Sequence, residues 1–133
     1  MTVSKYSDRK IMPPHILPEV EAFWKATSKG RLLLKRCDDC REFHYYPRDI
    51  CPYCLSENTI WHEASGNGFI YSFSTMMSND IIYTLAYVTL DEGVSVLTNI
   101  VHAEPENINI GQRVKVVFMS SEGGEAVPMF TPI

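Results

Sequence analysis

Four cysteines are the residues of this chain best suited to chemistry. Cys37, Cys40, Cys51 and Cys54 form the pattern Cys-x2-Cys-x10-Cys-x2-Cys, and the sequence has no other cysteine. Two Cys-x2-Cys turns can present four thiolates at the corners of a tetrahedron, which is the closed geometry of structural zinc sites. Paired disulfides are disfavoured because they are rare in the cytoplasm, where we expect this protein. The spacing therefore predicts one structural zinc ion held by these four residues.

Two redox alternatives accompany the zinc prediction. The tetrapeptide Cys51-Pro52-Tyr53-Cys54 is also that of glutaredoxin active sites. Such chemistry needs a thiolate whose pKa is lowered at a helix N-terminus, whereas this tetrapeptide lies between expected strands, close to a second cysteine pair. A four-thiolate site can also take iron, so a rubredoxin-like electron carrier stays an alternative.

No other residue pattern indicates a reaction centre. The four histidines are scattered along the chain, and of these only His44 lies between the two cysteine pairs. Because four cysteines already complete a tetrahedral shell, we expect the histidines to be solvated or hydrogen-bonded. There is no spare cysteine for nucleophilic catalysis and no Ser/His/Asp signature. We therefore predict no catalytic residue.

An amphipathic helix is expected ahead of the cysteines, after a polar arm over residues 1–14. Pro18 suits the first helical position, and Gly30 suits the position after the last. Apolar side chains recur at helical spacing and form one stripe. This stripe consists of Val20, Phe23, Trp24 and Thr27. It either packs on the protein's own barrel or docks a partner.

From Arg31 onward the pattern changes to short strands. The runs are rich in Val, Ile, Tyr, Phe and Thr, and turn signals separate them. The clearest hairpin turn is Asp91-Glu92-Gly93. Strands at such intervals without intervening helical patterns indicate a small antiparallel barrel. The predicted fold is mainly β, with an N-terminal helix and a four-cysteine ribbon before the barrel.

Composition and charge limit the function classes. Of 133 residues, 45% are hydrophobic and 21% are charged, which is ordinary for a soluble globular domain. No apolar run could span a membrane or serve as a signal peptide, so we expect a cytoplasmic protein with no membrane partner. Residues 61–133 carry two Lys/Arg against eight Asp/Glu. An acidic barrel would repel a phosphate backbone, which disfavours the alternative of a single-stranded nucleic-acid-binding protein.

Several motifs in a fixed order resemble a known family. The helix is followed by RLLLKRCDDC, YYPRDICPYC and Trp61, and then by SGNGFIYSFSTM, LDEGVSVLTNIV and INIGQRVKVVF. This succession, over about residues 15–130, resembles the acyl-CoA-associated OB-fold proteins, in which a rubredoxin-like zinc ribbon precedes an OB barrel. The resemblance implies an arm and helix over residues 1–30, a ribbon over 31–60 and a barrel over 61–133.

The resemblance also implies a function. Proteins of this family are non-catalytic partners of thiolase-fold enzymes, namely acyl-CoA thiolases, acyltransferases and aldolases. Their ribbon contacts the enzyme, and their barrel helps to form or cover the acyl-CoA channel. We therefore expect an accessory subunit in a hetero-oligomer, with a structural zinc and a coenzyme A thioester shared with the enzyme. The resemblance carries the four cysteines over as the zinc ligands.

Two sets of residues are candidates for contacts with coenzyme A. The first set is basic and suits anionic phosphates. It comprises Arg31, Lys35, Arg36, Arg41 and Arg48. The second set alternates along one expected strand and so would share a barrel face. It comprises Phe69, Tyr71 and Phe73. Solvated charges around a ribbon and ordinary core packing explain the same patterns. For docking the enzyme, the candidate surfaces are the stripe Val20, Phe23, Trp24 and the ribbon tip Tyr45, Tyr46, Tyr53.

Overall fold

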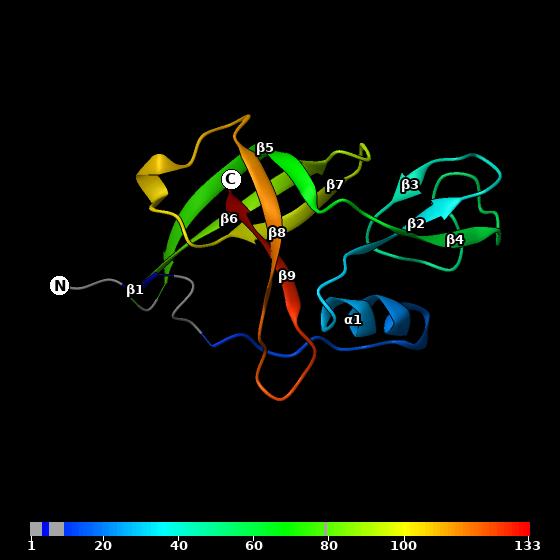
Figure 1. Ribbon diagram of the computed structural model, residues 1–133, viewed down its shortest axis with the longest axis horizontal. Coiled ribbons are helices and arrows are strands. Elements are labelled where there is room, and N and C mark those ends of the chain that lie inside the picture. The colour runs from blue at the N-terminus through cyan, green and yellow to red at the C-terminus, as the bar shows by residue number, and fades with distance from the viewer. Residues whose placement is uncertain (1–3, 6–9, 79) are drawn as a thin grey trace.

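The computed structural model describes residues 4–5, 10–78 and 80–133 (Figure 1). The fold is mainly β, as predicted, with one short α-helix near the N-terminus. Part of the expected arm, residues 1–3 and 6–9, lies outside the described residues. The elements are β1 Ser4–Lys5, η2 Pro18–Val20, α1 Glu21–Thr27, β2 Leu33–Cys37, β3 Phe43–His44, β4 Thr59–Glu63, β5 Asn67–Ser78, β6 Ile81–Leu90, β7 Ser95–Ile100, η3 Pro105–Asn107, β8 Arg113–Met119 and β9 Val127–Pro132.

The predicted helix forms as a 3-10 turn that runs into α1. Pro18 begins the turn, at a position where a backbone N–H would have no partner within the helix, so its missing N–H costs no hydrogen bond. Gly30 adopts a φ of 75°, and its N–H bonds to the carbonyl of Thr27, which ends the helix. The helix contacts β2 and β9, so it lies between the two sheets.

A small antiparallel sheet carries the cysteines. Its strand order is β3-β2-β4, and β2 pairs with β4 from Leu33–Glu63 to Cys37–Thr59. This sheet lies at one end of the molecule, with the barrel at the other (Figure 1). Strand β4 crosses the expected boundary between residues 60 and 61 and belongs to the ribbon sheet. The division of the chain at residues 30 and 60 stays a proposal.

Of the other six described strands, β5 to β9 close into a five-stranded barrel, the OB fold that was predicted, and β1 pairs with the outer end of β6. Neighbours run β6-β5-β8-β9-β7, and β7 pairs back to β6. The turn Asp91-Glu92-Gly93 joins β6 to β7, with the N–H of Gly93 bonded to the carbonyl of Leu90. Core side chains such as Ile70, Val88 and Phe130 fill the interior. Burial of these apolar side chains is the main stabilising contribution.

A close approach of backbones explains one glycine at the barrel's start. A Cβ at Gly68 would lie 2.4 Å from the carbonyl oxygen of Thr89 on β6. No side chain fits there without moving the strands apart. Just before it, Gly66 has a φ of +82°, a backbone conformation that glycine adopts freely. The predicted turn signal Ser65-Gly66-Asn67-Gly68 therefore marks where the chain leaves the ribbon sheet and enters the barrel.

A β-bulge in β5 places one aromatic residue on the opposite face from the one predicted. The register between β5 and β6 shifts between Ile70 and Ser72. Beyond the shift, Phe73 pairs with the buried Ala86 and packs against the core, whereas Phe69 and Tyr71 are exposed. The prediction that these three residues share a face was wrong, because one extra residue reverses the alternation.

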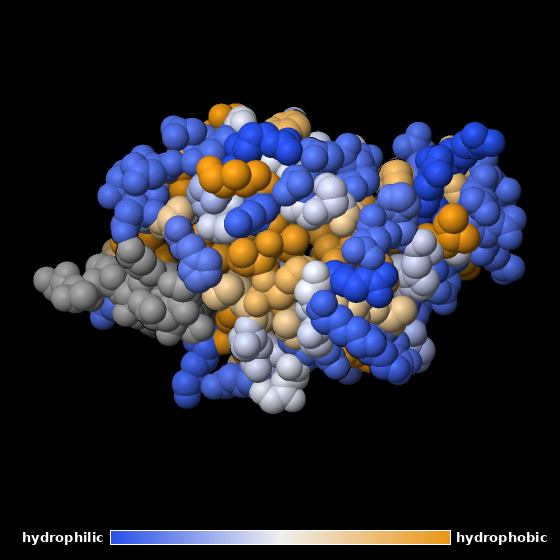
Figure 2. Space-filling view, in the orientation of Figure 1, coloured by the Kyte–Doolittle hydropathy of each residue, from blue (hydrophilic) through white to orange (hydrophobic). Residues whose placement is uncertain are grey.

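The surface of the molecule is mixed. On the face seen in Figure 2, apolar residues gather in the middle, over β8 and β9, and hydrophilic residues dominate the ribbon end. Among the described residues, no helix is long and apolar enough to cross a membrane.

Candidate metal centre

Two similar turns position the four cysteines. In the first turn, the N–H of Cys37 bonds to the carbonyl of Glu42, and the N–H of Cys40 points at the Cys37 sulfur at 3.5 Å. In the second, the N–H of Cys51 bonds to the carbonyl of Ser56. Each turn therefore folds its two thiols to the same side of the chain. Backbone N–H groups directed at sulfur also favour the thiolate form.

The residue after the second cysteine of each turn has a left-handed conformation. Arg41 has a φ of 64° and Leu55 a φ of 65°. Neither is glycine, so each position stores about 1–2 kcal/mol of backbone strain. Such strain persists where the surrounding structure holds the conformation in place. Here the two knuckles hold it, and this is consistent with a metal that ties their ends together.

The four sulfur atoms converge within bonding range of a single ion. All four lie within 4.8 Å of one another. The Cys37 and Cys54 sulfurs are 3.5 Å apart, and those of Cys40 and Cys51 are 3.6 Å apart. A disulfide requires about 2.0 Å, whereas tetrahedral zinc with bonds of about 2.3 Å places its sulfurs about 3.8 Å apart. The predicted ligands therefore fit zinc and form no disulfide.

Ionisation of the thiols also favours a bound cation. The pKa of Cys37 is lowered to about 7, first by the backbone hydrogen bond at Cys40. The pKa of Cys40 is raised to about 12, although the backbone hydrogen bond at Glu42 lowers it, because burial and the three other thiols oppose a second charge. The pKa of Cys54 is also raised. A cation between the four sulfurs would favour the thiolate form of each.

Polar contacts outside the cysteines tie the two turns together. The carboxylate of Asp39 accepts hydrogen bonds from Ser56 and Asn58, and these bonds lower its pKa. The carbonyl of Asn58 accepts the N–H of Asp38 at 2.8 Å. These contacts join the first turn to the second independently of metal.

His44 is buried beside this cluster and is not needed as a ligand. Its Nε2 accepts the N–H of Arg48 at 3.3 Å, and its Nδ1 has no partner among the described residues. Burial lowers its pKa, and the nearby ammonium of Lys35 acts in the same direction. The ring is therefore neutral at physiological pH. It contributes to ribbon packing, as a hydrogen-bonded histidine was expected to do.

The basic residues proposed for coenzyme A do not form one patch. Arg31 is paired with Glu63 at 2.8 Å. Lys35 is only 6% exposed, and its ammonium lies 4.5 Å from the Trp61 ring centroid and 3.9 Å from Asp49. Burial inside the ribbon removes Lys35 as a free contact for a phosphate. Contacts with coenzyme A by the other residues stay a proposal.

The three remaining arginines keep their guanidinium groups nearer the surface. Arg36 donates to the carbonyl of Arg41 at 3.3 Å, and Arg48 is exposed. Arg41 lines a groove between the ribbon and the β6–β7 turn, together with Tyr53, Glu42 and Glu92. The two carboxylates there oppose a phosphate. Arg36 and Arg48 are therefore the better candidates.

The expected docking surfaces divide into buried and exposed residues. The stripe Val20, Phe23 and Trp24 is buried, with Trp24 only 8% exposed, so the hypothesis that it docks a partner was wrong and the alternative of packing within the chain is confirmed. The indole N–H of Trp24 donates to the Tyr46 hydroxyl at 2.7 Å. At the ribbon tip, Tyr53 is exposed.

Sequence reasoning singled out Tyr71 but missed the exposed apolar face of the barrel to which it belongs. Tyr87 on β6 lies opposite Leu97 on β7, and both side chains point away from the core. Tyr71, at the bulge, is exposed beside them. Each of the three stands at an outward position of its strand, where a polar residue is usual. That departure from alternation could have signalled the face, which we call the docking face and define as Tyr71, Tyr87 and Leu97.

Comparisons with known proteins agree with this architecture. Residues 24–59 match the model of the ChsH2 rubredoxin-like zinc ribbon domain, and residues 61–119 match that of the ChsH2 C-terminal OB-fold domain. A DUF35 domain-containing scaffold protein of Methanothermobacter thermautotrophicus is 34% identical, over 69% of this chain and 76% of its own length.

Other relatives differ in length and in what their names say. A probable enoyl-CoA hydratase alpha subunit of Thermomonospora curvata is 29% identical over 93% of this chain, but the chain spans only 41% of that subunit. A chain of the structure described as Ltp2-ChsH2(DUF35) aldolase is 28% identical with a TM-score of 0.77, over 90% of this chain and 98% of that one. A DUF35 protein of Sulfolobus solfataricus, with a TM-score of 0.64 and 13% identity over 87% of this chain and 86% of that one, shares the fold.

Proposed function

Because the chain belongs to the family of DUF35 domain-containing scaffold proteins with a ChsH2 zinc ribbon and OB fold, we propose that it is a non-catalytic subunit of an acyl-CoA-processing enzyme of thiolase fold. In this role the ribbon and the barrel bind the enzyme, and the barrel covers part of the acyl-CoA channel. The partner is a thiolase, an acyltransferase or an aldolase.

The observation that carries the proposal is the docking face. Tyr71, Tyr87 and Leu97 are 64%, 48% and 56% exposed, although they lie side by side on a folded sheet. Large aromatic residues are enriched at the centres of protein interfaces, where a few of them contribute most of the binding energy. An exposed cluster of this kind on a small barrel marks an interaction site.

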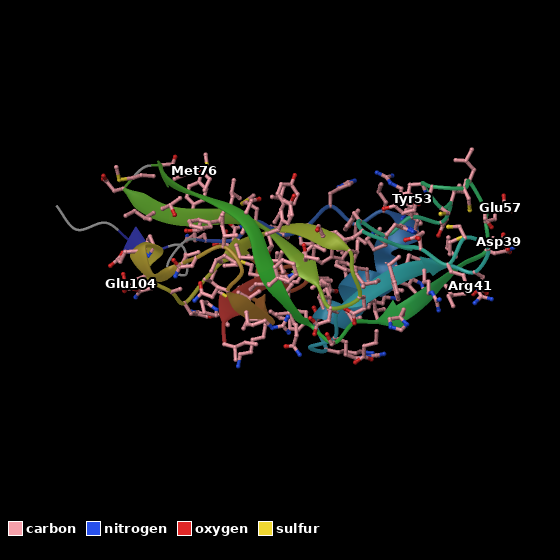
Figure 3. All side chains as sticks on the ribbon, turned by 90° about the horizontal axis from the view of Figure 1, so that it is seen from above. Asp39, Arg41, Tyr53, Glu57, Met76 and Glu104 are labelled. Atoms are coloured by element: carbon pink, nitrogen blue, oxygen red, sulfur yellow. The ribbon has the colours of Figure 1, made fainter. Side chains whose placement is uncertain are left out.

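The ribbon presents an exposed aromatic residue on the same side of the molecule as Met76 of β5. In Figure 3, Tyr53 on the ribbon and Met76 on β5 both project from the upper side, at opposite ends. Both side chains are exposed. An enzyme seated on this side could contact both ends at once, and a zinc-held ribbon would keep Tyr53 in a fixed position relative to its own sheet. A fixed aromatic side chain loses little conformational entropy on binding.

A binding role is also consistent with the titratable groups. Among the described residues, the four cysteines are the only convergent group of three or more His, Cys, Asp or Glu side chains. Zinc would occupy all four and would act here as a structural ion rather than as a Lewis acid, because a closed shell leaves no site for substrate. The relatives support the same reading, since one is named a scaffold and another a subunit of a hydratase.

Coenzyme A is proposed as a ligand shared with the enzyme. Arg36 and Arg48 are the candidate contacts for its phosphates, and Phe69 and Tyr71 are candidate contacts for its flexible arm. Both lie on β5, where Tyr71 is part of the docking face and Phe69 is a neighbouring exposed residue. The acyl chain would then lie between the barrel and the enzyme.

The test is complex formation with a thiolase-fold enzyme encoded beside this chain. The two purified proteins are mixed and followed by titration calorimetry, and acyl-CoA turnover is measured for each alone and for the mixture. We expect a stable complex, turnover by the enzyme that rises on mixing, and no turnover by this chain alone.

Variants locate the contact. Tyr87→Ala removes an exposed ring worth about 2 kcal/mol at an interface, so affinity should fall at least tenfold with an unchanged melting temperature. The matched control is Met12→Ala, which removes a still more exposed apolar side chain from the N-terminal segment, 75% against 48% for Tyr87. Acyl-CoA turnover by the isolated chain, or no binding to the enzyme, would overturn the proposal.

A further inference from the structure

Within the described residues, one edge of β5 has no partner strand over most of its length. On one side β5 pairs with β6 as far as Ser78, but on the other it pairs with β8 only at Asn67–Phe69. The loop residues Gly111 and Gln112 bond to Ile70 and continue this edge by one residue. Beyond Ile70, no further backbone bond to this edge is found in the described part of the chain. Residues 74–78 are all exposed.

In the part of the chain that the structure describes, this edge lacks the usual protection against pairing. Residues 72–78 read SFSTMMS, with no charge and no proline. Natural edge strands generally carry lysine, proline or a covering segment, because an open row of N–H and C=O groups is a template for another strand. The bulge lies at the start of this segment and leaves its outer part regular.

The same hairpin already accepts an added strand on its opposite edge. Strand β1 pairs in parallel with β6, with Ser4 opposite Ile81 and Lys5 opposite Ile82. The outer part of the β5–β6 hairpin is therefore a two-stranded arm, and β1 adds a third strand to it on the β6 side. An arm of two strands is marginal by itself, and pairing stabilises it.

We propose that the free edge of β5 pairs antiparallel with the same edge of a second copy of this chain, with Thr75 on the two-fold axis. In this register Phe73 lies opposite Met77 of the second copy, and Ser74 lies opposite Met76. The contact is self-complementary, as a two-fold dimer requires. Both copies thereby satisfy the backbone groups that residues 72–78 direct to the free edge.

The side chains suit this register on both faces of the sheet. Phe73 and Thr75 face the same side as Ala86 and Thr84. On that side the register brings sulfur to an aromatic ring and threonine to threonine, and both are favourable cross-strand contacts. Within the chain, Thr75 and Thr84 already form such a pair, with hydroxyl oxygens 3.1 Å apart. No like charges meet, because the segment has none.

A second copy is favoured over a foreign strand by this symmetry and neutrality. A charged edge would favour a partner strand of opposite charge. This uncharged edge favours a strand that is also uncharged and whose side chains match its own in shape and alternation. The pairing uses the edge of β5, while the docking face uses side chains perpendicular to the sheet. The inference therefore does not depend on the proposed function.

The experiment is sedimentation of the full zinc-loaded chain over a wide range of concentration, without any enzyme. We expect a monomer–dimer equilibrium. Ser74→Lys places two like charges diagonally across the axis, about 7–8 Å apart, and should weaken the dimer at least tenfold. Ser120→Lys adds the same charge at an exposed position outside the strands and should leave it unchanged.

Cross-linking tests the register. Under mild oxidation, Thr75→Cys should link to itself across the axis, whereas Ser78→Cys, expected opposite Ser72, should not. A chain that stays monomeric at every concentration would overturn the proposal, as would a dimer unaffected by Ser74→Lys. Protection of residues 72–78 from hydrogen exchange only when the enzyme is added would assign the edge to the enzyme instead.

Discussion

Replacement of Trp24 separates a residue that stabilises the fold from one that docks a partner. The side chain is 8% exposed, and its ring lies at 86° to that of Phe23 with centroids 4.9 Å apart. A buried aromatic side chain of this size removes about 150–250 Å² from water, which corresponds to about 4–6 kcal/mol at 25 cal/mol/Å². Measured losses for such truncations are about 3–5 kcal/mol. We expect Trp24→Ala to lower the free energy of unfolding by that amount.

Milder variants keep the prediction measurable if Trp24→Ala fails to fold. Trp24→Phe retains most of the ring but removes the indole N–H that donates to Tyr46 at 2.7 Å. Tyr46→Phe removes the other partner. Each should cost about 1 kcal/mol or somewhat more, and the double variant should cost less than the two together, because they share one hydrogen bond.

The assay is urea unfolding followed by circular dichroism, together with affinity for the enzyme. A domain of this kind has about 5–15 kcal/mol of stability, so Trp24→Ala takes a large part of it. Tyr53→Ala is the matched control, because its exposed side chain should change stability by at most about 0.5 kcal/mol. If Trp24→Ala left stability within about 1 kcal/mol of the parent while enzyme affinity fell tenfold, the packing argument would be refuted.

Two further predictions concern the ribbon. Cys40→Ser should abolish stoichiometric zinc binding, which elemental analysis measures. It should also unfold residues 37–54, seen as faster hydrogen exchange, because zinc binding supplies on the order of 10 kcal/mol of folding free energy. Full zinc content in that variant would contradict the ligand assignment. Because burial lowers the pKa of His44 below its unfolded value of about 6.5, the unfolded state binds a proton first. The free energy of unfolding should therefore be constant above that pH and fall below it. His44→Gln should reduce this fall relative to the parent protein, with zinc content monitored in both. An equal fall in both proteins would exclude His44 as the cause.

The local patterns of the sequence were enough to predict several elements. The Cys-x2-Cys spacing predicts paired thiols because a tight turn places residues three apart on one side of the chain. The structure brings the two pairs together as expected. Pro18, Gly30 and the Asp91-Glu92-Gly93 turn likewise mark boundaries, because they act through the conformational limits of one or two residues. Interactions of this range are contained in the sequence itself.

The tertiary structure decided which face each periodic element buries. The stripe of α1 was compatible with packing inside the chain or against a partner, and only the meeting of the helix with the ribbon and the barrel places Trp24 against Tyr46. Strand alternation could not place Phe73, because the bulge in β5 depends on its pairing with β6. The ion-pair partners of the basic residues could not be predicted from the sequence, since Arg31–Glu63 and Lys35–Asp49 join positions 32 and 14 residues apart.

The docking face likewise could not be predicted from the sequence alone. Tyr71, Tyr87 and Leu97 are far apart in the chain, and the departure of each from alternation does not show that they share one surface. Cross-strand pairing brings Tyr87 opposite Leu97, and the bulge turns Tyr71 outward beside them. The sequence specifies local conformation through short-range sterics, whereas a surface exists only once distant segments have paired.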